Sequence, residues 1–234
     1  MGRPVTALVL GGTGAVGSQI IEILLERKAK VIATSRDGKR LNSRSIPVQW
    51  NAENSLPLSM HLDKEDRHLL VFYCVGASSS KMKVSETDCN EFRDLFEVNV
   101  LGFVRVLHAI KTCTLESVDC VAISSDATVS ARALNGPYSA SKSALEIVSR
   151  TIASEEGSEF FRFNVLAPSL IDSEMARSIN RKIGNLNFQD VTSRLPMGRA
   201  ISPEEVARAA VDLAGAKQWS YTNGQVFRIS SPPR

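Results

Sequence analysis

Residues 6–17 read TALVLGGTGAVG, and this stretch decides the fold. Its first five residues are typical of a buried strand, and an apolar helical face follows at 18–27. Between them Gly12, Gly14 and Gly17 form a G-x-G-x-x-G pattern. Glycine suits this turn because the backbone needs dihedral angles closed to side chains and must approach a pyrophosphate closely. The stretch therefore predicts a dinucleotide site, although the same turn could also join strand to helix and bind nothing.

The rest of the chain alternates short β-branched runs with helical patterns. Strands are predicted at 6–10, 30–34, 48–50, 69–74, 119–123, 163–166 and 225–229. Helices are predicted at 18–27, 88–111, 138–153 and 202–213. Repeated β-α units with right-handed crossovers give an α/β fold with a doubly wound parallel sheet, the Rossmann fold. We expect one domain over residues 1–234.

Three segments carry further local signals. The helix at 88–111 is apolar nearly all round, so it lies deep in the core or is shared with another subunit. Ser202-Pro203-Glu204-Glu205 is a strong helix start, with an N-cap serine, a proline at the first position and acids in the first turn. Residues 180–195 are polar without clear periodicity and are predicted to form a mobile loop or lid. The tail at 230–234 is expected to fray.

Composition excludes several classes of protein. The 234 residues carry a net charge of +3 without basic runs interleaved with aromatics, so a nucleic acid partner is not expected. No apolar run is long enough for a bilayer, and the N-terminus lacks the pattern of a signal peptide, so we expect a cytoplasmic protein. The four cysteines form no C-x-x-C pair and the three histidines are scattered, which predicts reduced thiols and no metal site.

The second predicted strand ends in Ser35-Arg36, about 20 residues after the glycine loop. An acid at this place would hold the ribose hydroxyls of NAD, whereas an arginine pairs with the 2′-phosphate of NADP. Lys39 and Arg40 strengthen the positive charge, while Asp37 complicates it. The sequence thus favours NADP(H), with NAD(H) as the alternative cofactor.

Ser125, Tyr138 and Lys142 are the candidate catalytic residues. A carbonyl that receives a hydride becomes an oxyanion that needs a proton, but a tyrosine with a pKa near 10 is a poor base. A lysine four residues further along a helix lies on the same face and stabilises the phenolate. Ser125 follows a strand, where parallel sheets bind ligands. The alternative is a surface Tyr–Lys pair with an ordinary turn serine.

Five stretches in this order make the chain resemble the short-chain dehydrogenase/reductase family, in its short single-domain branch. They are the glycine loop, residues 98–102 with Asn99, Ser124-Ser125 before Tyr138-Ser139-Ala140-Ser141-Lys142, residues 164–168, and residues 203–207. The resemblance implies that Tyr138 is the general acid or base and that Lys142 holds the nicotinamide ribose and lowers the tyrosine's pKa. It also implies that Ser125 binds the substrate carbonyl and that Asn99 supports a water linking the lysine to solvent.

The resemblance also implies a set of cofactor-binding residues. Besides Tyr138 and Lys142, they are Gly11, Thr13, Gly14, Ala15, Val16, Gly17, Ser35, Arg36, Asn51, Ala52, Cys74, Val75, Gly76, Pro168, Ser169, Ile171 and Ser173. Some positions depart from the family pattern: Leu10 and Ala15 in the glycine loop, Tyr73-Cys74-Val75-Gly76 for N-N-A-G, Asn51 for an acid, Pro168-Ser169 for P-G, and Ser173 for a threonine. Of these, Tyr73 is expected to reshape the pocket.

These observations predict an NADP(H)-dependent oxidoreductase that interconverts a carbonyl and an alcohol on a small to medium organic substrate. Its substrate pocket is expected at 78–84 and 130–135, under a lid at about 170–195. The resemblance implies a homodimer or homotetramer built on the helices at 88–111 and 138–153. Two alternatives stay open: a dinucleotide-sensing regulator that has lost turnover, supported by the departure at 73–75, and an epimerase or dehydratase acting on a nucleotide sugar.

Overall fold

A computed structural model describes residues 5–130, 132–158, 160–182 and 187–230 of the chain. Within these residues, seven parallel strands form one sheet in the order β3-β2-β1-β4-β5-β6-β7. The strands are β1 (Thr6–Leu10), β2 (Lys30–Ser35), β3 (Ile46–Gln49), β4 (His68–Tyr73), β5 (Ser117–Ile123), β6 (Phe161–Pro168) and β7 (Val226–Ile229). The α/β class and the doubly wound sheet are therefore confirmed.

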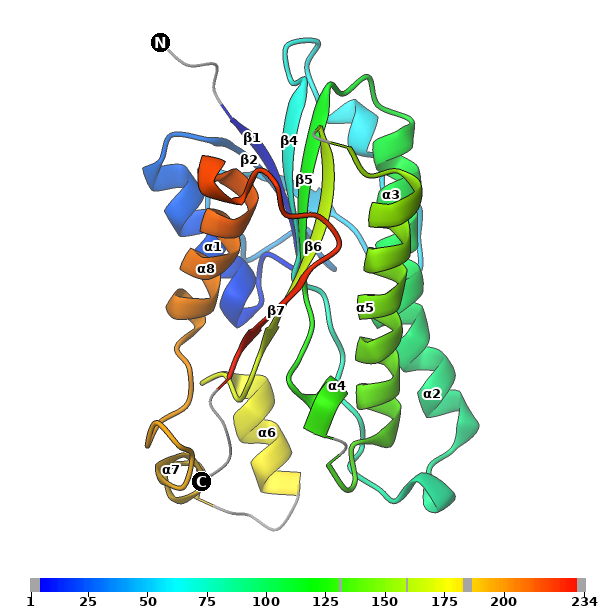
Figure 1. The fold of residues 1–234 in the computed structure, drawn as a ribbon, viewed down its shortest axis with the longest axis vertical. Coiled ribbons are helices and arrows are strands. Elements are labelled where there is room, and N and C mark those ends of the chain that lie inside the picture. The colour runs from blue at the N-terminus through cyan, green and yellow to red at the C-terminus, as the bar shows by residue number, and fades with distance from the viewer. Residues whose placement is uncertain (1–4, 131, 159, 183–186, 231–234) are drawn as a thin grey trace.

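Helices cover both faces of this sheet (Figure 1). One face carries α1 (Ala15–Glu26) and α8 (Pro203–Gly215), which pack against each other. The other face carries α2 (Cys89–Phe96), η3 (Glu97–Leu101), α3 (Gly102–Lys111) and α5 (Gly136–Glu155). Shorter elements complete the described chain: η1 (Leu58–Met60), η2 (Val84–Glu86), α4 (Ala127–Ser130), α6 (Glu174–Lys182), α7 (Phe188–Ser193) and η4 (Lys217–Trp219).

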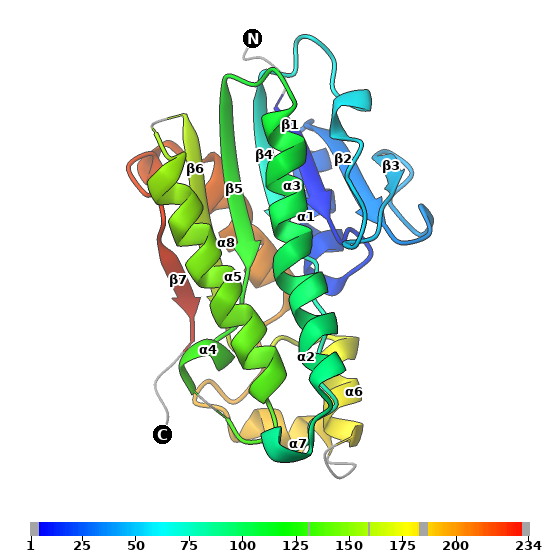
Figure 2. The same cartoon turned by 90° about the vertical axis from the view of Figure 1, so that its right-hand side faces the viewer.

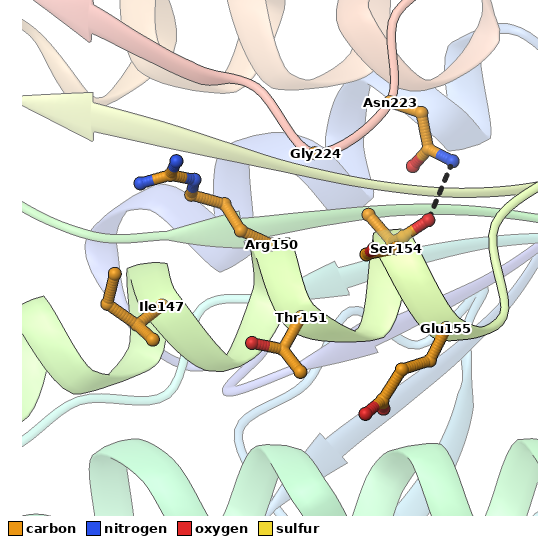
Figure 3. Close-up of a pocket in the computed structure, with 8 residues that line it drawn as sticks. Ile147, Arg150, Thr151, Ser154, Glu155, Asn223 and Gly224 are labelled. Carbon is orange, nitrogen blue, oxygen red and sulfur yellow. Dashed lines mark hydrogen bonds between the residues drawn. The ribbon is translucent and has the colours of Figure 1, made fainter.

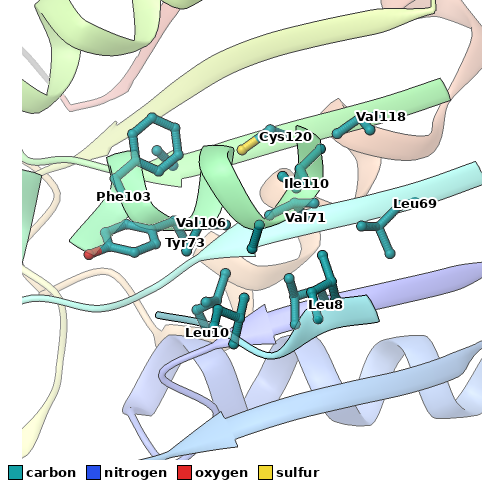
Figure 4. Close-up of a cluster of buried hydrophobic side chains, with 14 of the residues drawn as sticks. Leu8, Leu10, Leu69, Val71, Tyr73, Phe103, Val106, Ile110, Val118 and Cys120 are labelled. Atoms are coloured by element: carbon teal, nitrogen blue, oxygen red, sulfur yellow. The ribbon is translucent and has the colours of Figure 1, made fainter. Parts of the chain in front are cut away.

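Two apolar cores lie on opposite sides of the sheet because successive side chains of a strand point to opposite faces. In β1, Leu8 and Leu10 pack toward α3, whereas Ala7 and Val9 pack toward α1 and α8. Figure 4 shows the first core, where strand residues meet Phe103, Val106 and Ile110 of α3. Burial on both faces explains why the strands read as continuous apolar runs.

The strand order places a crevice at the carboxyl end of β1. The chain leaves β1 for β2 on one side and later returns to β4 on the other, so the connections diverge there. Ligands of doubly wound sheets bind at such a switch point. The turns after β1 and β4 abut, since a Cβ built on Gly11 would lie 3.2 Å from the Cys74 carbonyl. Figure 2 shows α4, α6 and α7 gathered beyond this end of the sheet.

Most predicted elements are confirmed, with ends that shift by a few residues. The signal at Ser202 is borne out in detail. The Ser202 hydroxyl accepts from the backbone N–H of Glu205 at 3.1 Å, and the Ser202 N–H donates to the Glu205 carboxylate at 2.8 Å. This reciprocal pairing satisfies two N–H groups that a helix start leaves open. The Asn223-Gly224 turn leads into β7, and only a short helical turn, η1, lies between β3 and β4.

Three elements differ from their predictions for identifiable reasons. The first helix begins at Ala15 rather than at residue 18, because Gly14 is already its N-cap. The third strand lies at Ile46–Gln49 rather than 48–50, and it contains Pro47. A strand can accept that proline because β3 is at the edge of the sheet. The helix at 88–111 is interrupted by η3, a π-helical turn.

The segment at 180–195 is helical in part, so the prediction of a mobile loop is wrong for the residues that α6 and α7 include. Helix α6 reaches Lys182, and α7 starts where the Asn187 side chain accepts from the backbone N–H of Gln189 at 3.0 Å. Residues 183–186 and the tail at 231–234 lie outside the described residues. Among the described helices, none combines the length and the apolar character that a bilayer crossing requires.

Candidate active site

A cleft of about 660 Å³ opens at the switch point of the sheet. It is lined by Gly11, Thr13, Gly14, Ala15, Val16, Thr34, Ser35, Arg36, Arg40, Trp50, Asn51, Ala52, Glu53, Cys74, Val75, Gly76, Ala77, Val98, Ile123, Ser124, Tyr138, Lys142, Ile171, Ser173 and Met175. The volume lies within the range that small-molecule and cofactor sites occupy. The fold thus gathers most of the predicted site residues from the carboxyl ends of six strands and from η3 and α5.

The glycine loop forms one wall of the cleft and leaves no room for side chains. A Cβ on Gly17 would lie 2.3 Å from the Gly11 carbonyl oxygen, and Gly11 itself has a φ of +78°. Gly17 therefore supports the turn from behind, while Gly11 and Gly14 line the cleft. The N-cap Gly14 offers no side chain to the first turn of α1, so its N–H groups are left for a ligand. A bare helix N-terminus fits the pyrophosphate of a dinucleotide.

The end of β2 supplies positive charge beside this wall. Arg36 and Arg40 line the cleft with Ser35. Asp37 faces its own turn, where its carboxylate accepts from the Lys39 N–H at 3.0 Å and from the Ser35 hydroxyl at 3.2 Å. The Lys39 N–H, with help from Ser35 and Arg40, lowers the pKa of Asp37. The carboxylate is thus occupied within the turn, where it also pairs with Arg40 at 3.5 Å, and Arg36 is left to the cleft.

Residues after β3 line the cleft beside the end of β2, since the Trp50 N–H donates to the Ser35 carbonyl at 2.9 Å. Asn51 and Ala52 line the cleft as predicted, together with Trp50 and Glu53, which the sequence interpretation did not include. The Ala52 carbonyl accepts from the Arg105 guanidinium at 2.9 Å, so α3 holds this turn in place. In the sequence, the only signal for Trp50 and Glu53 was that they flank the predicted pair Asn51-Ala52.

The turn after β4 lines the cleft through Cys74, Val75 and Gly76, as predicted. Tyr73 is fully buried instead, and its hydroxyl donates to the Val98 carbonyl at 2.6 Å. The expectation that Tyr73 reshapes the pocket is therefore wrong: its side chain supports η3 from the sheet. Burial raises the pKa of Cys74 to about 12, with the Lys142 charge opposing the rise, so this thiol stays protonated at neutral pH.

Asn99 connects the turn after β4 to α5. Its carbonyl oxygen accepts from the Ala77 N–H at 2.9 Å, and its amide donates to the Ser141 hydroxyl at 2.9 Å. Gly76 lies between Asn99 and Lys142, since a Cβ built there would be 3.2 Å from the lysine nitrogen. The π-helical turn that carries Asn99 thus brings a buried amide to the side of the lysine.

Lys142 is buried at the floor of the cleft. Its ammonium donates to the Ile123 carbonyl at 2.9 Å. Burial lowers the pKa of Lys142 to about 8, although the neighbouring Cys74 and Glu146 act in the opposite direction. A buried ammonium is costly, so a lysine kept here needs polar partners. The Ile123 carbonyl is the partner that the structure shows.

Tyr138 lies one helical turn before Lys142 and close to Ser125. Burial raises the pKa of Tyr138, and the Ser125 side chain opposes this rise. The structure therefore brings the three candidate catalytic residues together. The expected lowering of the tyrosine's pKa by Lys142 is not among these effects, since the ammonium is directed to the Ile123 carbonyl.

A second lysine, Lys81, lies beside the tyrosine; it belongs to the predicted pocket range 78–84 but was not singled out there. The Lys81 ammonium lies 5.5 Å from the centre of the Tyr138 ring and is hydrogen-bonded to the Asn135 side-chain oxygen. Lys81 has a φ of +70°, a conformation that side chains other than glycine seldom adopt. No sequence motif marked Lys81, because its place over the ring results from a loop conformation.

The segment after β6 reaches the cleft through Ile171 and Ser173. Pro168 and Ser169, earlier in this segment, instead take part in backbone hydrogen bonds. The Pro168 carbonyl accepts from the Asp126 N–H at 2.9 Å, and the Ser169 N–H donates to the Ile229 carbonyl at 2.9 Å. Pro168 and Ser169 thus connect the Ser125 turn and β7 to the end of β6 and do not line the cleft.

A second hollow, of about 550 Å³, lies on the surface at the end of α5 (Figure 3). It is lined by Ile147, Arg150, Thr151, Ala153, Ser154, Glu155, Asn223 and Gly224. These residues share nothing with the cleft at the switch point, to which we assign the chemistry. Across the described ranges, no three His, Cys, Asp or Glu side chains are grouped so that they could hold a metal ion.

Comparisons with known proteins agree with this geometry. The 3-oxoacyl-(acyl-carrier-protein) reductase of Chlamydia trachomatis is 25% identical over 96% of this chain and 95% of its own. A tropinone reductase homolog of Arabidopsis thaliana is 28% identical over 96% of this chain and 90% of its own. Among solved structures, the ligand-free aldohexose dehydrogenase of Thermoplasma acidophilum has a TM-score of 0.83 at 21% identity and covers 99% of this chain and 98% of its own.

A structure described as ElxO with NADP bound has a TM-score of 0.81 at 19% identity, over 97% of both chains. At these identities the two solved structures show the fold. Residues 15–231 match a protein-family model described as enoyl-(acyl carrier protein) reductase. This match spans almost the whole chain, and with the reductases above it shows that the chain belongs to the short-chain dehydrogenase/reductase family of NAD(P)-dependent oxidoreductases.

Proposed function

We propose that the chain uses NADP(H) to interconvert a carbonyl and an alcohol on a small to medium organic substrate. One observation carries this proposal: Tyr138, with Ser125 beside it, lies in the same cleft as a glycine loop shaped for a pyrophosphate. When bound, the nicotinamide would supply or accept the hydride. The side chains of this chain would bind the substrate and transfer the proton.

Tyr138 is the proton donor in reduction. Burial raises the pKa of Tyr138, so the phenol is protonated at neutral pH and ready to protonate a developing oxyanion. Ser125 holds the carbonyl oxygen next to it, as a second hydroxyl aimed at the same place. Lys142 and Asn99 hold the nicotinamide ribose side of the site.

The preference for NADP(H) over NAD(H) rests on Arg36 and Arg40. Both line the cleft at the end of β2, where the adenine ribose of a dinucleotide lies in this fold. Guanidinium groups pair with phosphate through parallel hydrogen bonds. The acid that would bind both ribose hydroxyls of NAD is missing there, because Asp37 is occupied within its own turn.

The structure also supports proposals on organisation. We infer one NAD(P)-binding domain over residues 1–234, with α6 and α7 forming a lid at about 170–195 over a pocket that includes 78–84 and 130–135. Phe96, Leu101 and Ile147 expose apolar side chains on α2, η3 and α5, which fits assembly into a homodimer or homotetramer. The free thiols of the four cysteines fit the cytoplasm. Light scattering of the purified protein tests the assembly.

Turnover of NADPH with a panel of ketones tests the function, with Tyr138→Phe as the decisive variant. The phenylalanine keeps the ring and removes the proton, so the rate should fall about 100-fold or more. Tyr221→Phe is the matched control, since Tyr221 is fully exposed and should leave the rate unchanged. Turnover that survives Tyr138→Phe would refute the acid role.

The same assay separates the alternative predictions. A dinucleotide-sensing regulator would bind NADPH without turnover of any ketone. Its support, the departure at residues 73–75, is weakened because Tyr73 is directed into the core and away from the cleft. An epimerase or dehydratase would return the cofactor unchanged after converting a nucleotide sugar. Net oxidation of NADPH therefore distinguishes the proposed reductase from both.

A further inference from the structure

A buried carboxylate lies behind the proposed catalytic residues. Glu146 is on α5, four residues after Lys142, and only 7% of it is exposed. One of its oxygens, Oε1, accepts from the Ser124 hydroxyl at 2.7 Å and lies 2.9 Å from the Thr128 hydroxyl. The other, Oε2, accepts from the Arg228 guanidinium at 3.0 Å. The carboxylate therefore joins the end of β5, α4, α5 and β7.

This network holds both flanks of Ser125. Ser124 precedes it, and Thr128 follows in α4, with its hydroxyl 3.0 Å from the Ser125 carbonyl oxygen. A hydroxyl has one proton, so Thr128 donates to Glu146 or to the Ser125 carbonyl, one at a time. Arg228 also donates to the Thr128 oxygen at 3.0 Å. The turn that presents the Ser125 side chain is thus fixed from two sides by Glu146.

The chemistry of the network makes it rigid. A carboxylate taken out of water is expensive unless charge and hydrogen bonds compensate it. Glu146 has both, from one guanidinium and two hydroxyls. Arg228 is 29% exposed in its side chain, so the pair lies at the edge of the core with the carboxylate inward. Loss of either partner leaves the other unsatisfied, and the turn loses its preferred position.

We propose that Glu146, oriented by Arg228, is a positioning residue that holds the Ser125 hydroxyl against Tyr138. The inference rests on the proposed function, because it gives Glu146 a role in the same reaction. It makes β7, near the C-terminal end of the described chain, part of the support of the active site. The Glu146 charge also acts on Lys142, where it opposes the lowering of that lysine's pKa by burial.

Glu146→Met tests the proposal through kcat and cofactor affinity measured separately. A serine hydroxyl displaced from its productive place should lower kcat for ketone reduction about ten- to hundredfold. The Kd for NADPH should change less than about twofold, because the carboxylate does not line the cleft. Glu155→Met is the matched control: it removes an exposed acid from the same helix and should match the wild type.

Repeating the Glu146 substitutions in a Ser125→Ala background distinguishes a positioning role of Glu146 from general stabilisation of the fold. If Glu146 acts through the Ser125 hydroxyl, Glu146→Met should cost little more in kcat once Ser125→Ala is present. Multiplicative losses in the double variant, or a fall in NADPH affinity that matches the fall in kcat, would overturn the proposal. If Glu146→Met does not fold, Glu146→Gln keeps the shape and an acceptor oxygen, and the same non-additivity is expected with a smaller loss.

The activity of the wild type distinguishes a failure of the proposed function from a failure of the positioning role of Glu146. Absence of ketone-dependent NADPH oxidation in the wild type would refute the proposed function. Turnover that requires Tyr138 but is indifferent to Glu146→Met and Glu146→Gln would refute only the positioning role.

Discussion

The ammonium group of Lys81 lies 5.5 Å from the centre of the Tyr138 ring. A cation over an aromatic face is attracted to the ring, and more strongly when the ring carries phenolate charge. We expect Lys81→Met to disfavour the phenolate by about 0.5 to 1 kcal/mol, which lowers kcat/KM for alcohol oxidation at neutral pH about two- to fivefold. The sign follows from the charge: without the cation the phenol holds its proton to higher pH.

Full pH profiles of oxidation check this expectation. The basic form of the tyrosine should be reached at higher pH in Lys81→Met than in the wild type. Lys83→Met is the control, since Lys83 is exposed on the same loop and pairs with Glu86. Identical profiles for Lys81→Met and wild type would show that the lysine does not act on the tyrosine.

Tyr73 supplies the next prediction, because its hydroxyl donates to the Val98 carbonyl of the turn that carries Asn99. Tyr73→Phe leaves this carbonyl without its donor and should lower the free energy of unfolding by about 1 to 3 kcal/mol. Urea denaturation measures the change, with the exposed Tyr221→Phe as a control for phenol removal. An unfolding free energy equal to that of the wild type would mean that the buried carbonyl finds another donor.

Arg36→Ala separates the two cofactors. A hydrogen bond to a charged group contributes about 1.5 to 3 kcal/mol, so the KM for NADPH should rise about ten- to hundredfold while that for NADH changes little. Arg44→Ala is the charge-matched control, because Arg44 pairs with Glu22 and does not line the cleft. An equal rise for both cofactors, or none, would contradict the proposed contact with the 2′-phosphate.

The sequence predicted what depends on local chemistry. The glycine loop, the apolar strands and the helix start at Ser202 follow from backbone rules that act within a few residues. The order of these elements was enough to predict the sheet, and the sheet then places Cys74 and Ser124 at the same end as the glycine loop. Most of the residues that line the cleft could be named in advance, because the family resemblance indicated them and the sheet gathers them at this end.

Contacts between distant segments could not be predicted in this way. The π-helical turn at Glu97–Leu101 has an ordinary helical composition. Its contacts are visible only in the structure, where Tyr73 of β4 donates to its Val98 carbonyl and its Asn99 amide donates to Ser141 of α5. Likewise, Glu146 looks like a surface acid on α5 until Arg228 of β7 is placed beside it. The polar helices α6 and α7 have only nine and six residues, which is too short for periodicity to separate them from a loop.

Lys142 gives a prediction on stability. In the ligand-free protein burial lowers the pKa of Lys142 from 10.5 to about 8. Below pH 8 the folded and unfolded chains both hold the proton, and the folded chain bears the full cost of the buried charge. Between about pH 8 and 10.5 the unfolded chain binds a proton that the folded chain has released, so stability rises with pH. Lys142→Met should therefore be more stable than the wild type at pH 7, by about 1 to 3 kcal/mol.

The greater stability of Lys142→Met should diminish as the pH rises toward 10, because Lys142 of the wild type then loses its proton and its buried charge. Urea denaturation of both proteins at pH 7 and pH 9.5 measures it, and taking the difference removes the titration of other groups. Lys111→Met controls for the loss of an ammonium on the surface, where Lys111 pairs with Glu156. A difference between wild type and Lys142→Met that stays constant with pH would contradict the depressed pKa. A wild type that is the more stable protein at pH 7 would show that the Ile123 hydrogen bond outweighs the burial of the charge.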